Sequence, residues 1–311
     1  MEARMRLFGW RRVEFLAPEQ WRLIADSGRW DNAYFILGDE YENPRLEVTW
    51  RKMKLPKGGL AKLLQIYLKN LRKQLSKELG KRAARELEVS EPRERFVAGH
   101  PALSCTLSLR GGVSSVNLWR CGDTGRVVLA QLNYREAERG EYLQLEERLL
   151  SSFKCHPGSQ VLWTPGPLSF HLPYTYALVE GSLNPLFSYL QYAAPRESRY
   201  LIIAWSEMSS RVLPQYGGSL KKWYAEAVVK NVLGGLRGYR LKFKESSGEG
   251  GRVAVLEGHS IVMLPYVLKK VYGIAWLSGE MMLSLTTVSF AEQFDDALRD
   301  LRSVERQVRG G

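Results

Sequence analysis

Hydrophobic positions follow the same order twice along the chain. Each half opens with an apolar strand that ends in proline, VEFLAP in one half and LSFHLP in the other, and continues through an irregular stretch with several aromatic residues. A second strand follows, PRLEVTW (44–50) or RYLIIAW (199–205), whose β-branched and aromatic residues favour an extended chain. A Leu-Pro and Gly-Gly turn then precedes a helical pattern in both halves. The pattern therefore predicts one domain that occurs twice.

The helical patterns differ in length. The first half carries a leucine stripe at i, i+4 and i+7 spacing, which predicts one helix over about residues 60 to 88. Its members are Leu60, Leu64, Leu68, Leu71, Leu75 and Leu79. The second half has a shorter apolar stripe that begins at Leu220 and ends before Gly234 and Gly235. Each stripe predicts a helix that packs on a sheet.

The remainder of each half predicts three strands and a closing helix. Short turns between the apolar runs fit antiparallel hairpins. The predicted strands lie near 95–109, 115–121 and 126–134, and near 252–268, 271–277 and 280–289. The predicted closing helices span roughly 141–154 and 290–306. The fold class is therefore α+β, with two tandem copies of an antiparallel sheet covered by helices.

Single residues recur at offsets of 155 to 159 positions and support the repeat. The matched pairs are Trp50 with Trp205, Trp119 with Trp276, and Gly99-His100 with Gly258-His259. The segment 156–167, HPGSQVLWTPGP, contains three prolines and two glycines, which predicts a linker without regular structure. The expected domains are residues 1–155 and 168–311.

The order of elements resembles the PsbP-like superfamily. The shared features are the apolar strand that ends in proline, the aromatic lead, the strand that ends in tryptophan, the long helix, the meander and the final helix. The resemblance implies a binding role, because this family includes an extrinsic photosystem subunit and a partner of a small GTPase. No functional residue of the family matches closely enough to carry over.

Composition places the chain among ordinary folded proteins, with 45% apolar and 25% charged residues. No run approaches the roughly 20 apolar residues of a membrane helix. The N-terminal sequence MEARMRLFGWRRVEF lacks the apolar region of a secretory signal, so a cytoplasmic location is expected. High Arg, Glu, Tyr and Trp content with few Asn and Gln suggests a thermophilic source.

The positive charge is concentrated in one segment. The chain carries a net charge of +12, and residues 51–95 hold fourteen Lys or Arg against five Asp or Glu. The cations of the predicted helix fall mostly off its leucine stripe and are the candidate binding residues: Lys62, Lys69, Arg72, Lys73, Lys77, Lys81, Arg82 and Arg85. A row of cations on a helix can follow phosphates. A solvated helix face remains the plain alternative.

Cys105 and Cys121 bracket the segment TLSLRGGVSSVNLWR, which predicts a hairpin. Folding this segment about Val113 sets the two cysteines opposite each other, with Cα atoms about 4.4–6.8 Å apart, the range that permits a disulfide. The sequence leaves their redox state open. The second half has no cysteine at the matching positions, so the fold does not require a bridge.

No residue pattern predicts a metal, a cofactor or a catalytic site. His100 and His259 lie 159 residues apart without partners at ligand spacing, and Cys155-His156 stands alone. The glycine pairs before the helices lack the Gly-Lys-Ser/Thr ending of a phosphate loop and predict structural turns. We therefore expect a non-catalytic binding protein whose first domain docks on nucleic acid or a ribonucleoprotein. The alternatives are an interaction module for an acidic protein and, less favoured, an enzyme with a cleft between the repeats.

Overall fold

The computed structural model describes residues 4–156, 158–248, 251–261 and 268–310. The chain divides into two compact units, Met1–Gly158 and Ser159–Gly311. They are called unit 1 and unit 2 below, and each is described by itself.

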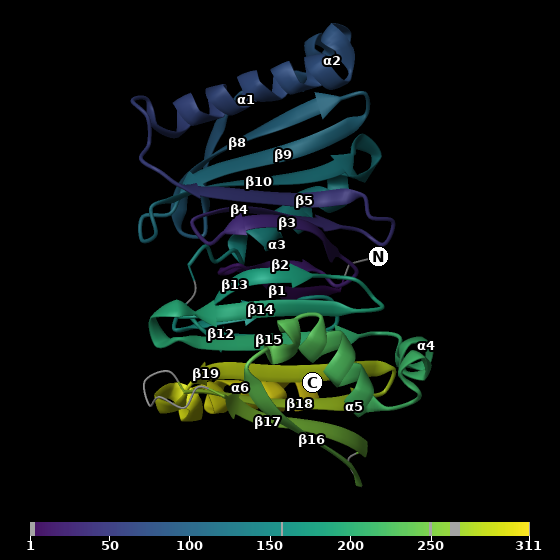
Figure 1. Cartoon of the computed structure of the whole chain (residues 1–311). Helices are drawn as coiled ribbons and strands as arrows, with labels where there is room; N and C mark the ends of the chain where they lie inside the picture. The colour runs from purple at the N-terminus through teal and green to yellow at the C-terminus, as the bar shows by residue number, and fades with distance from the viewer. Residues whose placement is uncertain (1–3, 157, 249–250, 262–267, 311) are drawn as a thin grey trace. The chain divides into compact units, whose positions relative to one another are not determined.

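Unit 1 has a two-stranded sheet (β1-β2) and an eight-stranded antiparallel sheet in the order β3-β4-β5-β10-β9-β8-β6, with β7 also paired to β8. Helices α1 and α2 lie along the β8–β9 side of the large sheet (Figure 1). The strands are β1 Met5–Trp10, β2 Val13–Pro18, β3 Arg22–Arg29, β4 Asn32–Gly38, β5 Pro44–Lys52, β6 Glu88–Val89, β7 Arg93–Val97, β8 His100–Leu109, β9 Gly112–Arg120 and β10 Arg126–Arg135. The α-helices are α1 Gly59–Glu78, α2 Gly80–Glu86 and α3 Arg139–Ser151.

Unit 2 has a two-stranded sheet (β11-β12) and a seven-stranded antiparallel sheet in the order β13-β14-β15-β19-β18-β17-β16. Its strands are β11 Gln160–Trp163, β12 Phe170–Pro173, β13 Ala177–Ser182, β14 Ser188–Ala194, β15 Arg199–Ser206, β16 Tyr239–Gly248, β17 Gly251–Ser260, β18 Lys269–Ser278 and β19 Met281–Phe290. Its helices are α4 Ser209–Val212, α5 Leu220–Trp223, which continues as a π-helix over Tyr224–Lys230, and α6 Phe294–Gly310.

The two units repeat one topology, so the predicted fold class is confirmed. Strands β3-β4-β5-β10-β9-β8 and β13-β14-β15-β19-β18-β17 follow each other in the same spatial order. In unit 1, Val128 of β10 lies between Trp50 and Trp119 on the neighbouring strands. In unit 2, Leu283 of β19 lies in the same way between Trp205 and Trp276. These tryptophan rows are buried and fix which residues of the two sheets correspond.

Two predictions about irregular segments were wrong. The aromatic stretches that follow the first strand of each half form β3-β4 and β13-β14, which extend the large sheets at one edge. The segment 156–167 includes β11, which pairs with β12 from Gln160 to Trp163, although its prolines and glycines predicted a linker. The prolines and glycines lie on either side of Val161, Leu162 and Trp163, so this short apolar run can pair with β12. The predicted strand 252–268 ends at Ser260, and residues 262–267 lie outside the described part of the chain.

The expected match of Gly99-His100 with Gly258-His259 was also wrong. Ala102 lies opposite Trp119, and Val253 lies opposite Trp276. Counting back along each strand, His100 therefore corresponds to Gly251. β8 and β17 begin at these corresponding residues, and Gly258-His259 lies seven residues further along β17, where it pairs with Leu241 and Arg240 of β16.

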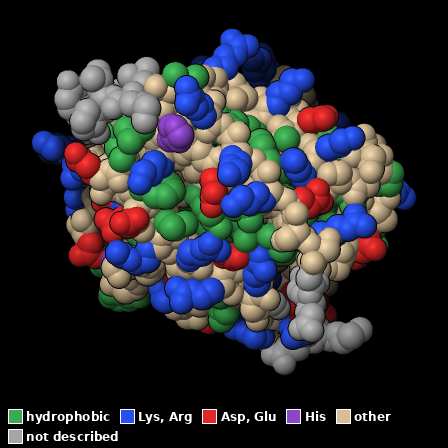
Figure 2. Space-filling model, turned by 60° about the horizontal axis from the view of Figure 1, so that its bottom comes forward, with side chains coloured by type: hydrophobic (Ala, Val, Ile, Leu, Met, Phe, Trp, Pro, Cys, Tyr) green, Lys and Arg blue, Asp and Glu red, His purple; other side chains and the backbone are tan. Residues whose placement is uncertain are grey.

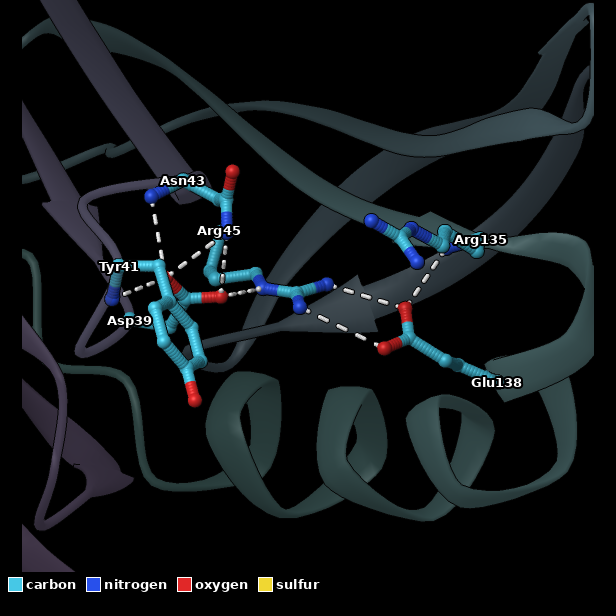
Figure 3. A network of polar contacts seen from close by, with 6 residues as sticks. All are labelled: Asp39, Tyr41, Asn43, Arg45, Arg135 and Glu138. Atoms are coloured by element: carbon cyan, nitrogen blue, oxygen red, sulfur yellow. Dashed lines mark hydrogen bonds and ion pairs between the residues drawn. The ribbon is translucent and has the colours of Figure 1, made fainter.

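An arginine at the start of one central strand anchors that strand in each unit. In unit 1, the Arg45 guanidinium donates to Asp39 (2.8 Å) in the preceding turn and to Glu138 (3.0 Å) before the closing helix (Figure 3). Asp39 also accepts the backbone N–H groups of Tyr41 and Asn43. In unit 2, Arg199 contacts Glu197 and Asp300 in the same manner. Each arginine therefore joins strand, turn and closing helix.

Among the described residues, none of the helices combines the length and the apolar character needed to cross a bilayer.

Candidate functional site

The eight predicted binding cations all lie exposed on α1 and α2. The leucine stripe faces the sheet as predicted, with Leu64 only 1% exposed and Leu68, Leu71 and Leu75 half-buried against β8 and β9 residues. Leu79, the last predicted member, follows α1 and is 56% exposed, so the prediction was wrong there. At 100° per residue, Lys62, Lys69, Lys73 and Lys77 fall on the side opposite Leu64. The helix therefore presents a cationic face, which the exposed Ile66 interrupts between Lys62 and Lys69.

These cations have few anionic partners. Among the described residues, Arg82 is the one candidate that pairs with a carboxylate, Glu86, and it is itself 91% exposed. Glu86 is shared with Arg110, and both hydrogen bonds hold its pKa below the ordinary value. The predicted single helix is interrupted between Glu78 and Gly80, where Gly80 has a φ of 90°. Lys81, Arg82 and Arg85 therefore belong to the separate helix α2.

The glycine pair before α1 has the geometry of a structural turn. Gly58 and Gly59 have φ values of 100° and 64°, in the left-handed region that favours glycine. The matching Gly217 and Gly218 of unit 2 have φ values of 64° and 73°. The structural interpretation of the two pairs is confirmed, since both bend the chain into a helix.

The predicted pairing of Cys105 with Cys121 was wrong. Cys105 lies opposite Val116 in the β8–β9 ladder and packs beneath α1, and all three cysteines are free thiols. The two-residue turn consists of Arg110 and Gly111, with φ values of 50° and 80°, as a type I′ hairpin requires. The fold-back therefore lies before Val113, the position expected from the sequence.

Cys121 instead belongs to a cluster that the sequence did not predict. His100, Cys121, Cys155 and His156 each point one ligand atom into a common site, and these four atoms lie within 4.8 Å of one another. The His156 Nδ1 atom is 3.3 Å from the sulfur of Cys121 and 3.3 Å from that of Cys155. The His100 Nε2 atom is 3.3 Å from the Cys155 sulfur. Both cysteines are fully buried.

Three separate segments build this cluster. His100 is the first residue of β8, Cys121 opens the turn between β9 and β10, and Cys155 follows α3. The turn is held by the Cys121 N–H, which donates to the Arg126 carbonyl at 2.8 Å. Beside Cys155, Lys154 exchanges two backbone hydrogen bonds with Glu14 of β2. These backbone contacts of the protein itself hold Cys121 and Cys155 in position.

The electrostatics of the cluster follow from burial and close contact. Burial, and then the hydrogen bond with Cys121, raise the pKa of Cys155 to about 12. Burial also acts to raise the pKa of Cys121, but hydrogen bonds from Thr124 outweigh it and lower the value. Burial, and then the neighbouring His156, lower the pKa of His100.

Little in the sequence pointed to this cluster. Successive ligands are 21 and 34 residues apart, except for the adjacent pair Cys155-His156, and no spacing of a known metal motif is present. The one available signal was that all three cysteines and two of the four histidines fall in residues 100–156. Only the register of β8 against β9, together with the anchoring of Lys154 on β2, brings them together.

A second polar group lies under α3. The buried Glu146 carboxylate accepts hydrogen bonds from Ser115 (2.7 Å) and Asn117 (3.0 Å) and pairs with Arg95 (3.1 Å). With three donors it is a satisfied structural acceptor that joins α3 to the sheet. The hypothesis of an enzymatic cleft between the repeats stays a prediction.

Comparison with known proteins gave matches among solved structures. No protein-family model matches the sequence, and the search among curated proteins found no relative. The chain is similar to cyanobacterial PsbP from Synechocystis sp. PCC 6803, with 12% identity over 50% of this chain and 93% of that one and a TM-score of 0.34. The resemblance drawn from the sequence named the same family.

Two further structures match nearly the whole length of the chain. The apo structure of the immunity protein TplEi of the T6SS from Pseudomonas aeruginosa matches 98% of this chain and 94% of its own, at 10% identity and a TM-score of 0.35. The structure of the Tle4–Tli4 complex matches 98% of this chain and 95% of that chain, at 9% identity and a TM-score of 0.34.

Proposed function

We propose that this protein acts by binding and that unit 1 docks on the phosphate backbone of a nucleic acid through α1 and α2. The observation that carries the proposal is the cationic face itself: eight exposed Lys and Arg side chains, of which Arg82 is paired with a carboxylate. Unpaired cations at helical spacing can neutralise successive phosphates and release their counterions.

Unit 2 supports this assignment by contrast. Its corresponding helix carries Lys221, Lys222 and Lys230 on the exposed side, but they form no comparable column. Figure 2 brings the end with β16 and β17 forward, and on this face Lys and Arg side chains are separated by hydrophobic and acidic ones. A dispersed arrangement like this is typical of a solvated surface.

The test is binding of the full chain to single- and double-stranded RNA and DNA over a range of salt concentrations. The variant K69E/K73E/K77E should weaken binding about 10- to 100-fold, equally for all sequences, because phosphate contacts position without reading bases. The salt dependence should flatten by about 0.7 to 0.9 of a log–log unit for each phosphate that the variant no longer neutralises.

The matched control is K221E/K222E/K230E, which changes the net charge equally on the corresponding helix of unit 2. It should bind within about threefold of the wild type, because its changes lie outside α1 and α2. If net charge alone drove binding, both variants would be weakened alike. Equal losses of affinity in the two variants would contradict the proposal. So would wild-type affinity no better than that of an equally basic control protein. Binding to an acidic polypeptide but not to nucleic acid would support the protein-interaction alternative instead.

A further inference from the structure

We propose that His100, Cys121, Cys155 and His156 form a structural zinc site in unit 1. The four residues supply two thiols and two imidazoles, a ligand set that occurs in closed tetrahedral zinc sites. This assignment is independent of nucleic-acid binding, because the cluster includes none of the α1 and α2 cations.

The distances fit one ion. With Zn–S bonds of about 2.3 Å and Zn–N bonds of about 2.0–2.1 Å, a sulfur and a nitrogen of a tetrahedral site lie about 3.6 Å apart. Three of the four sulfur–nitrogen distances in the cluster are 3.3 Å, and all four ligand atoms lie within 4.8 Å of one another. The four ligand atoms are therefore close enough to surround one ion after small rotations of their side chains.

The surroundings of His156 orient it as a ligand. Its Nε2 atom is 3.1 Å from the Asp123 carboxylate, while its Nδ1 atom is directed at the two sulfurs. The carboxylate accepts the Nε2 proton and so leaves the Nδ1 lone pair for the metal. A carboxylate behind a coordinating imidazole is the usual outer partner of a zinc ligand. His100 offers its Nε2 atom.

The chemistry of the set selects the metal. Thiolates are soft ligands and favour zinc over magnesium or calcium, which prefer oxygen. As the ion binds, the two thiols release two protons to solvent, and two Zn–S and two Zn–N bonds form. The ion with two thiolates and two neutral imidazoles is then electrically neutral, which suits a site whose cysteines are fully buried. Four protein ligands leave no open position, so the ion would be structural.

Unit 2 shows that the fold forms without such a site. In the register set by the tryptophan rows, His100 corresponds to Gly251 and Cys121 to Ser278. The closing helix of unit 2 continues to Gly310, whereas α3 ends at Ser151 and the chain then turns back through Cys155. The zinc ion would join the end of that shorter closing segment to β8 and to the β9–β10 turn.

The direct test uses the full chain, stripped of metal with a chelator under reducing conditions and titrated with Co²⁺. We expect saturation at one ion per chain, with the visible bands of tetrahedral cobalt and the near-ultraviolet band of thiolate-to-cobalt charge transfer. Zn²⁺ should displace Co²⁺. A wild-type protein that gives neither set of bands would overturn the proposal. So would a Cys121–Cys155 disulfide, found by mass spectrometry of freshly purified, unreduced protein that takes up no metal after reduction.

Metal binding by single-residue variants distinguishes the cysteines that bind the ion from a cysteine that is only buried. C121S and C155S should each weaken metal binding at least about 100-fold and reduce the charge-transfer band, whereas C105S, with its equally buried thiol outside the cluster, should bind as the wild type does. An equal weakening in C105S would contradict the assignment. D123N keeps all four ligands and, should the cysteine variants not fold, still tests the site. We expect it to weaken binding about 10- to 100-fold, and wild-type affinity in D123N would remove Asp123 from the assignment.

Discussion

The two units cover the same strands with a helix, but α1 lies shallow on its sheet and the α5 helix lies deep. Of the α1 residues, all of which are described, only Leu64 is fully buried. The corresponding stretch of unit 2 buries Trp223, Tyr224, Ala227 and Val228 completely or nearly so. The helix at this place in the topology therefore contributes mainly exposed surface in unit 1 and mainly core in unit 2.

The cause lies in one pair of facing residues on the sheet. Three residues before Trp119 on β9, unit 1 has Val116 opposite Gln131 of β10. Three residues before Trp276 on β18, unit 2 has Gly273 opposite Thr286 of β19. A helix tyrosine bonds to the same position in both, since Tyr67 donates to Gln131 at 2.6 Å and Tyr224 bonds to Thr286 at 2.7 Å. A glycine and a short hydroxyl admit the helix, whereas valine and glutamine hold it away.

The largest expected effect is therefore that of G273A. An added Cβ would lie 1.7 Å from the Tyr224 hydroxyl, so the helix or the strand must move. We expect a loss of about 3 kcal/mol in the free energy of unfolding, at the upper end of the usual cost of overpacking a core. Urea denaturation, followed by far-ultraviolet circular dichroism, measures it.

A double-mutant cycle with Y224F sharpens this prediction. Removing the hydroxyl relieves the worst contact, so G273A should cost clearly less in the Y224F background than in the wild type. The control is G140A, at a helical glycine whose added Cβ meets nothing within 4 Å, and it should be neutral or slightly stabilising. Additive effects of G273A and Y224F would show that the close approach of Tyr224 is not what the glycine permits.

A smaller effect is expected from the two tyrosine hydroxyls. Y224F leaves the fully buried Thr286 hydroxyl without its partner and should cost about 1–2 kcal/mol. Y67F should cost less than about 1 kcal/mol, because Gln131 is only partly buried and also donates to Asn133. Equal losses of stability would contradict the difference in depth. Burial raises the pKa of both tyrosines, that of Tyr67 to about 12, so neither hydroxyl ionises in this assay.

Periodicity predicted the elements that lie on one apolar stripe or in one hairpin. The leucine stripe, the meanders and the tryptophan rows are local patterns that burial makes visible in the sequence. The edge strands β3 and β13 were missed because edge strands are exposed on much of their surface, and neither strand has a buried residue. Their residues need not alternate between apolar and polar.

The depth of the helix and the Cys–His cluster depend on register, which the sequence did not reveal. Gly273 looks like any strand glycine until its position opposite Thr286 is known. Moving the β8–β9 turn from Val113 to Arg110-Gly111 separates Cys105 from Cys121 and sets Cys121 near His100. The exposed cations, by contrast, followed directly from the helical period, because a charged side chain off the apolar stripe has only solvent to face.

The smallest effect concerns the two arginine anchors and their dependence on pH. In unit 1, burial acts to raise the pKa of Asp39 and of Glu138, but hydrogen bonds, including those from Arg45, lower both below their ordinary values. A lowered carboxyl pKa stabilises the folded state above the unfolded pKa, and this contribution is lost as the pH falls through the folded pKa. R45Q should cost about 0.5 kcal/mol at pH 7, and its difference from the wild type should shrink below about pH 4.5.

Unit 2 provides the opposite sign. Burial raises the pKa of Asp300 despite Arg199, so the ionised carboxyl disfavours folding, and this cost disappears as the pH falls through the folded pKa. The stability of the wild type relative to D300N should therefore rise toward acid pH, whereas relative to R45Q it should fall. Urea denaturation at intervals between pH 7 and pH 3 measures both differences. If both differences in stability changed in the same direction with pH, the carboxyls of the two anchors would not have pKa shifts of opposite sign.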